Sequence, residues 1–401
     1  MRLCAPTVLR TMEGMGGRNP VLRPAPERWL ARIFGDAEET TFGSGWIAGT
    51  GSVFLGTLAV LGVVAFRFPG TLSTAGFREH YPLAWLRALL GVVIGVAFLA
   101  GALSMVLRRR KVLGSTGIGL ALVATLLGGA GVPIDSTFDQ PVTLGLDWFL
   151  LNLLLLAFVF VPLERAFPLR REQTTFRAGW TTDGMHFLVS HLAVQGLTFM
   201  TLLPATALAR LWQPAALRTA VVSQPGWLQL CEIVVLADLW QYWVHRAFHR
   251  VPWLWRFHAI HHSSRTIDWL AGSRLHVVDV LATRSMVLVP ILLLGFAPGP
   301  LYAYLVLVSF HAVFLHANVR FRLGALDWIV ATPRGHHWHH ALAPIDKNFA
   351  VHLPVLDALF GTLYLPRDAW PDAYGVEGEA VPDGWGGQLV YPFRRPTGYD
   401  E

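Results

Sequence analysis

Histidines are concentrated in one part of this sequence. Thirteen of the 16 histidines lie between residues 245 and 352. His245 and His249 form an HxxxH motif, and an HxxHH motif occurs twice, at residues 258–262 and at residues 336–340. Residues three and four apart share one face of an α-helix, so each motif would present its imidazoles together. Imidazole binds iron, zinc, copper and nickel, and the spacing therefore predicts metal binding.

The number of histidines indicates two metal ions. One zinc ion is satisfied by four ligands, whereas ten histidines belong to these motifs or stand between them: His245, His249, His258, His261, His262, His276, His316, His336, His339 and His340. Neutral imidazoles leave the charge of a metal uncompensated, so carboxylates should accept hydrogen bonds from the distal ring N–H groups. The candidate carboxylates are Asp238, Asp268, Asp279 and Asp346.

The other histidines have a simpler interpretation. A histidine that stands alone is more often a packing residue than a ligand. His337 is the odd member of its motif and would point away from the shared helical face. We therefore expect six histidines to pack or to face solvent: His80, His186, His191, His311, His337 and His352.

Long apolar segments surround the histidine motifs. The chain has 401 residues, of which 53% are hydrophobic and 14% are charged, whereas a soluble domain carries about 25% charged residues. Eight segments approach the roughly 20 residues that cross a bilayer. They are residues 46–66, 83–107, 112–132, 144–163, 186–209, 226–244, 277–297 and 299–317. The sequence therefore predicts an all-α fold, a polytopic membrane helical bundle of about eight segments.

The distribution of basic loops predicts which side of the membrane holds the histidines. Residues 108–111 and 164–171 are rich in arginine, whereas the loop at 132–142 has two aspartates and no lysine or arginine. By the positive-inside rule, the N-terminus and the loops after the second, fourth, sixth and eighth segments are cytoplasmic. Residues 245–276 and 318–401 then lie in the cytoplasm, where the histidines would form a metal-binding cap.

Charge and cysteine content exclude other classes of protein. The net charge is +6 and the longest basic run is residues 108–111, which argues against nucleic-acid binding. Cys4 and Cys231 are too few for a disulfide framework or a cysteine metal site. The N-terminus lacks the apolar core of a secretory signal peptide.

Together, these motifs resemble the fatty acid hydroxylase superfamily, also called the sterol desaturase family, of integral-membrane di-iron oxygenases. The similarity covers about residues 145–366. The matching stretches are DLWQYWVHRAFH (238–249), RFHAIHHSS (256–264), SRLH (273–276), HANV (316–319), TPRGHHWHH (332–340), DKNF (346–349) and LDALFGTLY (356–364).

The resemblance implies roles for individual residues. The eight histidines of the three motifs, apart from His337, would be iron ligands. His316 matches the histidine of the family's HAN element and would be a further ligand. His276 matches an Arg-x-His-Pro element, although Val277 replaces the proline. Asn318 would hold a metal-bound water.

The resemblance also implies an activity. Two Fe²⁺ ions would use O2 and external electrons to hydroxylate or desaturate a C–H bond of a lipid, such as a sterol, fatty acyl or sphingoid-type lipid. The sequence has neither a dinucleotide fingerprint after a strand nor a cysteine set for an iron–sulfur cluster. We therefore expect a separate electron donor, such as a reductase, a ferredoxin or a cytochrome b5-like protein. The expected location is a bacterial inner membrane or an ER-type membrane.

Three other functions share some of these features. A two-zinc hydrolase or isomerase would use the same ligands and differ only in the metal. A metal transporter would place histidine and aspartate near the bilayer midplane, whereas most of these histidines lie just outside the apolar segments. A bis-histidine haem protein needs one axial histidine from each of two helices, which leaves the repeated HxxHH motif unexplained.

The chain is expected to have four parts. Residues 1–45 would be a poorly ordered cytoplasmic segment, and residues 46–143 would form three additional transmembrane helices. Residues 144–366 would form the catalytic domain, and residues 367–401, rich in glycine, proline and aspartate, a cytoplasmic tail that acts as a capping loop. The additional helices could shape substrate access, support oligomerisation or dock the electron donor, and the sequence does not choose among these.

Overall fold

The computed structural model describes residues 43–72, 82–134, 146–196, 198–212, 214–377 and 381–394. Within these ranges the regular elements are helices, and two isolated β-bridges join extended segments. The predicted all-α fold is therefore confirmed for this part of the chain. The expectation of poor order for residues 1–45 falls almost wholly outside the described residues.

Three long helices form an N-terminal group. They are α2 (Trp46–Arg67), α5 (Leu83–Leu107) and α6 (Val112–Leu126), with the short α3 (Pro69–Leu72) and η2 (Gly129–Gly131) at their ends. α2 packs against both of the other long helices. Small residues allow this close packing. A Cβ added at Gly117 of α6 would lie 1.9 Å from Ser52 Oγ of α2. Ser52 Oγ also donates a hydrogen bond to Ala97 O of α5 at 2.6 Å.

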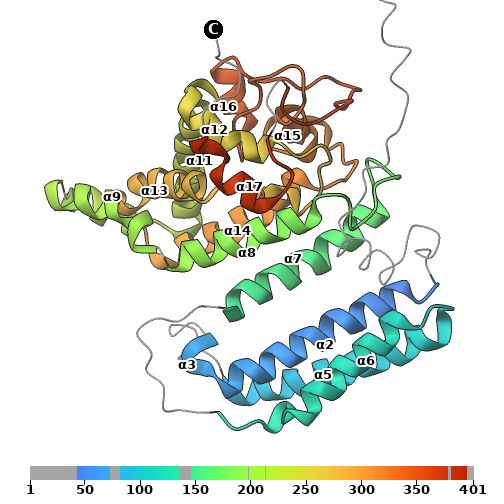
Figure 1. Ribbon diagram of the computed structural model, residues 1–401. Coiled ribbons are helices and arrows are strands. Elements are labelled where there is room, and N and C mark those ends of the chain that lie inside the picture. Colours follow the sequence, from blue (N-terminus) through green and yellow to red (C-terminus); the bar gives the residue numbers. More distant parts are fainter. Residues whose placement is uncertain are drawn as a thin grey trace, which may run out of the picture.

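The remaining helices form the part of the molecule that holds the histidine motifs. They are α7 (Leu146–Ala166), α8 (Trp180–Gly196), α9 (Thr198–Leu211), α10 (Ala215–Val222), α11 (Gly226–Arg250), α12 (Pro252–His262), η3 (Ala271–Ser273), α13 (Val277–Leu294), α14 (Pro298–His316), η4 (Gly324–Trp328), α15 (Pro333–His339), α16 (Pro354–Leu359), α17 (Trp385–Val390) and η5 (Tyr391–Phe393). In Figure 1, α7 lies between the N-terminal group and the rest of this part.

Five described helices are long and apolar enough to cross a membrane. They are Trp46–Arg67, Leu83–Leu107, Val112–Gly131, Val277–Leu294 and Pro298–His316. The protein is therefore a multi-pass integral membrane protein with five candidate spans in the described residues.

The three other predicted segments have different outcomes. The segment at 186–209 lies in α8, which ends at Gly196, and in α9, which begins at Thr198, and one continuous span stays a prediction there because residue 197 is outside the described residues. The segments at 144–163 and 226–244 lie in α7 and α11, which are continuous helices of 21 and 25 residues. α11 has lower mean hydropathy because its last turns carry the HxxxH motif and two arginines, Arg246 and Arg250.

The histidine motifs lie at the ends of helices. α11 ends just after His249, and Pro252 is the first residue of α12. Proline is tolerated there because an N–H group at the first helical position makes no hydrogen bond within the helix. α14 ends at His316. Pro333 starts α15 in the same way. These helix ends meet above the apolar helices and position the site.

The predicted capping role of the tail has a helical component. α17 and η5 lie in this tail and pack against α8 and α12. Arg256 Nη2 donates to Tyr391 O at 3.2 Å, and His186 Nε2 lies 2.8 Å from Gln388 Oε1. The described part of the tail therefore covers the metal-binding part of the molecule.

Candidate metal centre

Nine histidines converge in two buried groups. In each group the candidate ligand atoms lie within 4.8 Å of one another. The first group is His245, His249, His258, His262 and His339, and the second group is His261, His316, His336 and His340. Helices α11, α12, α14 and α15 supply these side chains, with His340 following α15 directly.

Each HxxHH motif contributes to both groups. In α12, His258 and His262 belong to the first group and His261 to the second. The other motif has the opposite pattern, because His336 and His340 belong to the second group and His339 belongs to the first. Residues i and i+4 stand above one another on a helix, whereas the residue beside them points about 100° away. The two helices therefore link the two groups.

The hydrogen bonds of the first group leave two ring nitrogens facing each other without a proton. His245 Nδ1 lies 2.8 Å from Phe349 O, and His258 Nδ1 lies 2.8 Å from Asp279 Oδ2. A carbonyl and a carboxylate only accept, so each Nδ1 carries the proton, and Nε2 of the neutral ring has only a lone pair. The two Nε2 atoms are 3.0 Å apart. Two lone pairs at this distance repel each other unless a cation lies between them.

The second group has the same arrangement. His261 Nδ1 donates to Arg274 O at 3.2 Å, and His316 Nδ1 donates to Ala312 O at 2.8 Å. Their Nε2 atoms are 3.3 Å apart, and His316 Nε2 is 3.0 Å and 3.2 Å from Nε2 of the two remaining members of the group. Two nitrogens bound to one tetrahedral metal at 2.0–2.1 Å would lie about 3.3 Å apart. The spacing therefore suits a shared metal ion.

Three further ring nitrogens of the first group are buried without a hydrogen-bond partner, namely Nε2 of His249, His262 and His339. Burial lowers the pKa of the His262 and His339 imidazoles well below the usual value, which keeps both rings neutral. An unpartnered buried polar nitrogen is costly, and a bound cation would remove that cost. The residues therefore fit two metal ions.

Two of the four predicted carboxylates contact ligand rings. Asp279 accepts from His258, as described above. Asp346 Oδ1 lies 3.4 Å from His249 Nδ1, and its side chain is 24% exposed. Of these two contacts, the one made by Asp279 is the shorter and better shielded, and the role of either carboxylate in orienting a metal ligand stays a prediction.

The other two carboxylates hold the backbone instead. Asp238 accepts backbone N–H groups from residues 351–353 at 2.6–3.0 Å. Asp268 accepts from Arg177 and from the N–H groups of Leu270 and Ala271. Neither contacts a ligand ring, because each carboxylate is already saturated by donors from a nearby loop.

Two other predicted site residues also have structural contacts. His276 belongs to neither group: its Nδ1 accepts from Val278 N at 3.1 Å and caps α13, and its Nε2 lies 3.1 Å from Leu389 O. Asn318 exchanges two hydrogen bonds with the backbone of Arg170, which fixes the loop after α14. The ring of His276 has no nitrogen left for a metal, because Val278 and Leu389 use both.

A buried ionic network that the sequence did not indicate lies beside the second group. Arg177 contacts Asp183 at 2.6 Å and Asp268 at 2.7 Å, and Asp183 also accepts from Arg274 Nε. The carbonyl of Arg274 accepts from His261, so the network holds the segment that orients this ligand. No spacing motif marks Arg177 or Asp183; only Arg274 lies in a stretch that resembled the family.

The described histidines that we assigned to packing lie outside both groups. His337 Nδ1 is 2.8 Å from Tyr374 Oη and its Nε2 is 3.2 Å from Ala317 O. His311 and His352 contact each other through their Nδ1 atoms at 2.7 Å. His80 lies outside the described residues.

The fold and the site define a multi-pass membrane protein with a buried, two-part histidine cluster, and comparison with known proteins shows its family. A family model described as fatty acid hydroxylase matches residues 230–362. The ornithine lipid hydroxylase OlsE of Rhizobium tropici is 31% identical over 254 residues, which cover 62% of this chain and 76% of that protein. The chain belongs to the fatty acid hydroxylase family and is an oxidoreductase of the hydroxylase and monooxygenase class.

More distant relatives share a shorter region. Human alkylglycerol monooxygenase is 34% identical over 128 residues, which cover 31% of this chain and 28% of that protein. The fatty acid hydroxylase vlmA of Lecanicillium sp. is 26% identical over 145 residues, or 32% of this chain and 40% of that protein. No solved structure matches the chain. The predicted family resemblance is confirmed.

Proposed function

We propose that this protein is a di-iron hydroxylase that inserts one oxygen atom of O2 into a C–H bond of a membrane lipid. The observation that supports this most is the pair of buried groups in which unprotonated imidazole nitrogens face one another. Iron bound there would supply the oxidation chemistry. The reaction balances when the lipid C–H becomes C–OH, the second oxygen leaves as water, and a donor supplies two electrons and two protons.

The nine grouped histidines are the proposed ligands. Backbone carbonyls and Asp279 hold the Nδ1 side of several rings, so the Nε2 lone pairs keep their direction. Phe349 is fully buried, with its ring centroid 5.0 Å from that of His249 and 5.6 Å from that of His245. This phenylalanine ring gives the first group an apolar neighbour on one side.

The proposed substrate is a polar lipid with a long alkyl chain. The similarity to a protein named as an ornithine lipid hydroxylase covers most of both chains, and a second relative is named for alkylglycerols. We therefore propose an ornithine-type acyl lipid as the first substrate to test, with an alkylglycerol as the second. Hydroxylation is favoured over desaturation because each of these relatives is named as a hydroxylase or a monooxygenase.

The arrangement in the membrane is also a proposal. Residues 46–143 would be helices added to a catalytic domain at residues 144–366, and the metal centre would face the cytoplasm. The basic loops at residues 108–111 and 164–171 support this orientation. A separate reductase, ferredoxin or cytochrome b5-like protein would reach the centre from that side and deliver the electrons.

Metal content tests the proposed centre. Detergent-purified protein, expressed in iron-rich medium, should contain about two iron ions per chain. A variant with both His339→Ala and His340→Ala removes one ligand from each group and should lose most of the iron. Two zinc ions without iron would favour a hydrolase or isomerase, and little metal of any kind would contradict the two-metal centre.

Lipid analysis tests the reaction. Cells that express the wild-type chain should accumulate a lipid one oxygen atom heavier than its precursor, and cells with the double variant should not. Feeding ¹⁸O2 should place the label in the new hydroxyl group. A label that comes from water instead would exclude an oxygenase.

A further inference from the structure

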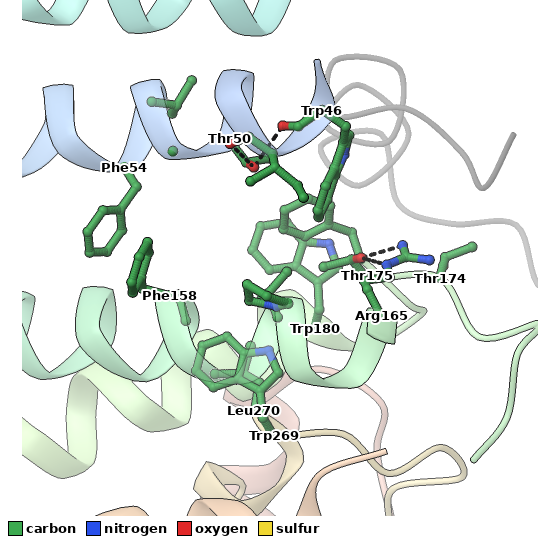
Figure 2. A pocket seen from close by; sticks show the side chains of 17 residues that line it. Trp46, Thr50, Phe54, Phe158, Arg165, Thr174, Thr175, Trp180, Trp269 and Leu270 are labelled. Atoms are coloured by element: carbon green, nitrogen blue, oxygen red, sulfur yellow. Dashed lines mark hydrogen bonds between the residues drawn. The ribbon is translucent and has the colours of Figure 1, made fainter. Parts of the chain in front are cut away.

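An apolar cavity lies at the junction between the N-terminal helices and the metal-binding part of the molecule. Its volume is 230 Å³. Trp46, Thr50 and Phe54 of α2 form one wall, and Phe158 of α7 lies opposite (Figure 2). The rings of Phe54 and Phe158 stack with their centroids 5.1 Å apart, so the two helices meet at one end of the cavity.

The cavity has one charged residue. Of the residues that line it, only Arg165 carries a charge, and its Nε donates to Thr175 Oγ1 at 2.7 Å. Trp180 lies close by in Figure 2. An arginine is suited to bind a carboxylate or a phosphate, and the aromatic and aliphatic walls are suited to hydrocarbon. The lining therefore fits a molecule with a long apolar chain and an anionic head.

The cavity lining includes residues that directly precede a segment packed against the proposed metal centre. Trp269 and Leu270 line the cavity, and the next three residues form η3. Within η3, Gly272 packs so closely that an added Cβ would lie 2.7 Å from His316 Nδ1. One short segment thus has a cavity residue at its start and a contact with a proposed ligand at its end.

The size of the cavity restricts its occupant. Pockets that enclose drug-sized ligands measure about 300–1,000 Å³, and this cavity is smaller. Part of one alkyl chain suits a cavity of this size. Its walls come from α2, which is a candidate membrane span, and from α7.

We propose that this cavity binds the alkyl chain of the lipid substrate, with a carboxylate or phosphate of the lipid at Arg165. The inference rests on the proposed function, since it concerns the substrate of that reaction. It gives α2 a role in substrate binding and chooses substrate access among the three roles that the sequence left open for the N-terminal helices.

Gly51 offers a way to close the cavity without disturbing the helix. It lines the cavity on α2, and an added Cβ there would meet no atom within 4 Å. Gly51→Trp should therefore fill the cavity. Gly119 on α6 also has open space around its Cβ position and does not line the cavity, so Gly119→Trp is the matched control.

Photolabelling tests binding. The probe is palmitic acid with a diazirine on its chain, added to the purified full-length protein and irradiated. We expect labelled peptides from α2 and from residues 157–180. Gly51→Trp should reduce this labelling by about tenfold, the effect of overfilling a site, and Gly119→Trp should leave it unchanged. Absence of label at these peptides in the wild type would overturn the inference.

Activity then tests whether the bound chain is the substrate. In cells that accumulate the hydroxylated lipid, Gly51→Trp should lower product about tenfold while the iron content stays at the wild-type level. Lost labelling with unchanged product would show an accessory lipid and would overturn the substrate role. Normal labelling in a chain that never hydroxylates a lipid would contradict the proposed function alone, because labelling does not require the metals.

Discussion

At the scale of single residues, the two nitrogens of each ligand imidazole have different tasks. Where an acceptor is present, Nδ1 donates outward to a carbonyl or a carboxylate, and Nε2 points into the group. An acceptor on one nitrogen selects the tautomer that frees the other for a metal. The site thus depends on residues that never touch the metal, and these residues make testable predictions.

Asp279→Asn should weaken metal binding by about 10- to 100-fold. The variant keeps an oxygen near His258 Nδ1 but removes the negative charge that makes the ring a better ligand. Chelator titration followed by iron analysis would measure the change. Asp346→Asn is the comparison: its contact with His249 is longer and partly exposed, so its effect should be smaller. Equal effects of the two substitutions would contradict this ranking.

His276→Ser should keep the wild-type metal content. The hydroxyl of serine can take over the cap of α13 that His276 Nδ1 provides, and serine is a favourable residue at that position. The matched variant His258→Ser removes a member of the first group and should lose iron. If His276→Ser lost as much iron as His258→Ser, the two-group assignment would be incomplete.

At the scale of elements, close helix packing explains how the N-terminal group is built. α2, α5 and α6 approach one another at small residues, since in lipid no hydrophobic force draws helices together and tight van der Waals packing has to replace it. Gly101 and Gly117 both face Ser52, and added Cβ atoms there would lie 2.7 Å and 1.9 Å from its Oγ.

Gly117→Leu should destabilise the N-terminal group by about 1–3 kcal/mol through overpacking. Thermal unfolding in detergent would measure the loss, and iron content should remain unchanged because the metal centre lies in other helices. Gly119→Leu is the control: Gly119 also lies in α6, an added Cβ there has no neighbour within 4 Å, and the substitution changes helix propensity in the same way. Identical unfolding of the two variants would show that the close approach of α2 and α6 has little energetic weight.

At the scale of the whole molecule, the metal centre joins segments that are far apart in the sequence. The grouped histidines, which are the proposed ligands, come from α11, α12, α14 and α15 and from His340, and backbone acceptors come from further loops. Bound metals would therefore tie the ends of four helices together, and the described tail covers them. In the absence of metal, the buried nitrogens that face one another destabilise this arrangement.

Removal of iron should lower the melting temperature of the purified protein. A ligand that binds only the folded state stabilises it by about 2.7 kcal/mol at a hundredfold excess over its Kd. Thermal unfolding with and without a chelator would measure the shift, and iron added back should reverse it. The variant with His339→Ala and His340→Ala should show no such response. If the wild-type protein had the same melting temperature with and without iron, that result would argue against metal in these groups.

The chemical class of the protein could be predicted from its amino-acid sequence alone. Helical spacing is local, so HxxxH and the two HxxHH motifs predicted shared faces, and the number of histidines predicted two metals. Apolar length predicted the five candidate spans that the structure describes. The spacing also separated His337 from its motif, since that residue points to Tyr374.

The contacts that these residues make could not be predicted without the three-dimensional fold. Adjacent histidines such as His261 and His262 point about 100° apart on one helix, but the group that each one joins depends on which other helices lie beside it, and spacing along one helix carries no information about that. His276 caps a helix because its Nδ1 accepts from Val278 N. Asp238 holds a loop because its carboxylate accepts from backbone N–H groups such as that of Val351. Hydrogen bonding of this kind depends on which segments meet in space, and that is set by packing rather than by any local pattern.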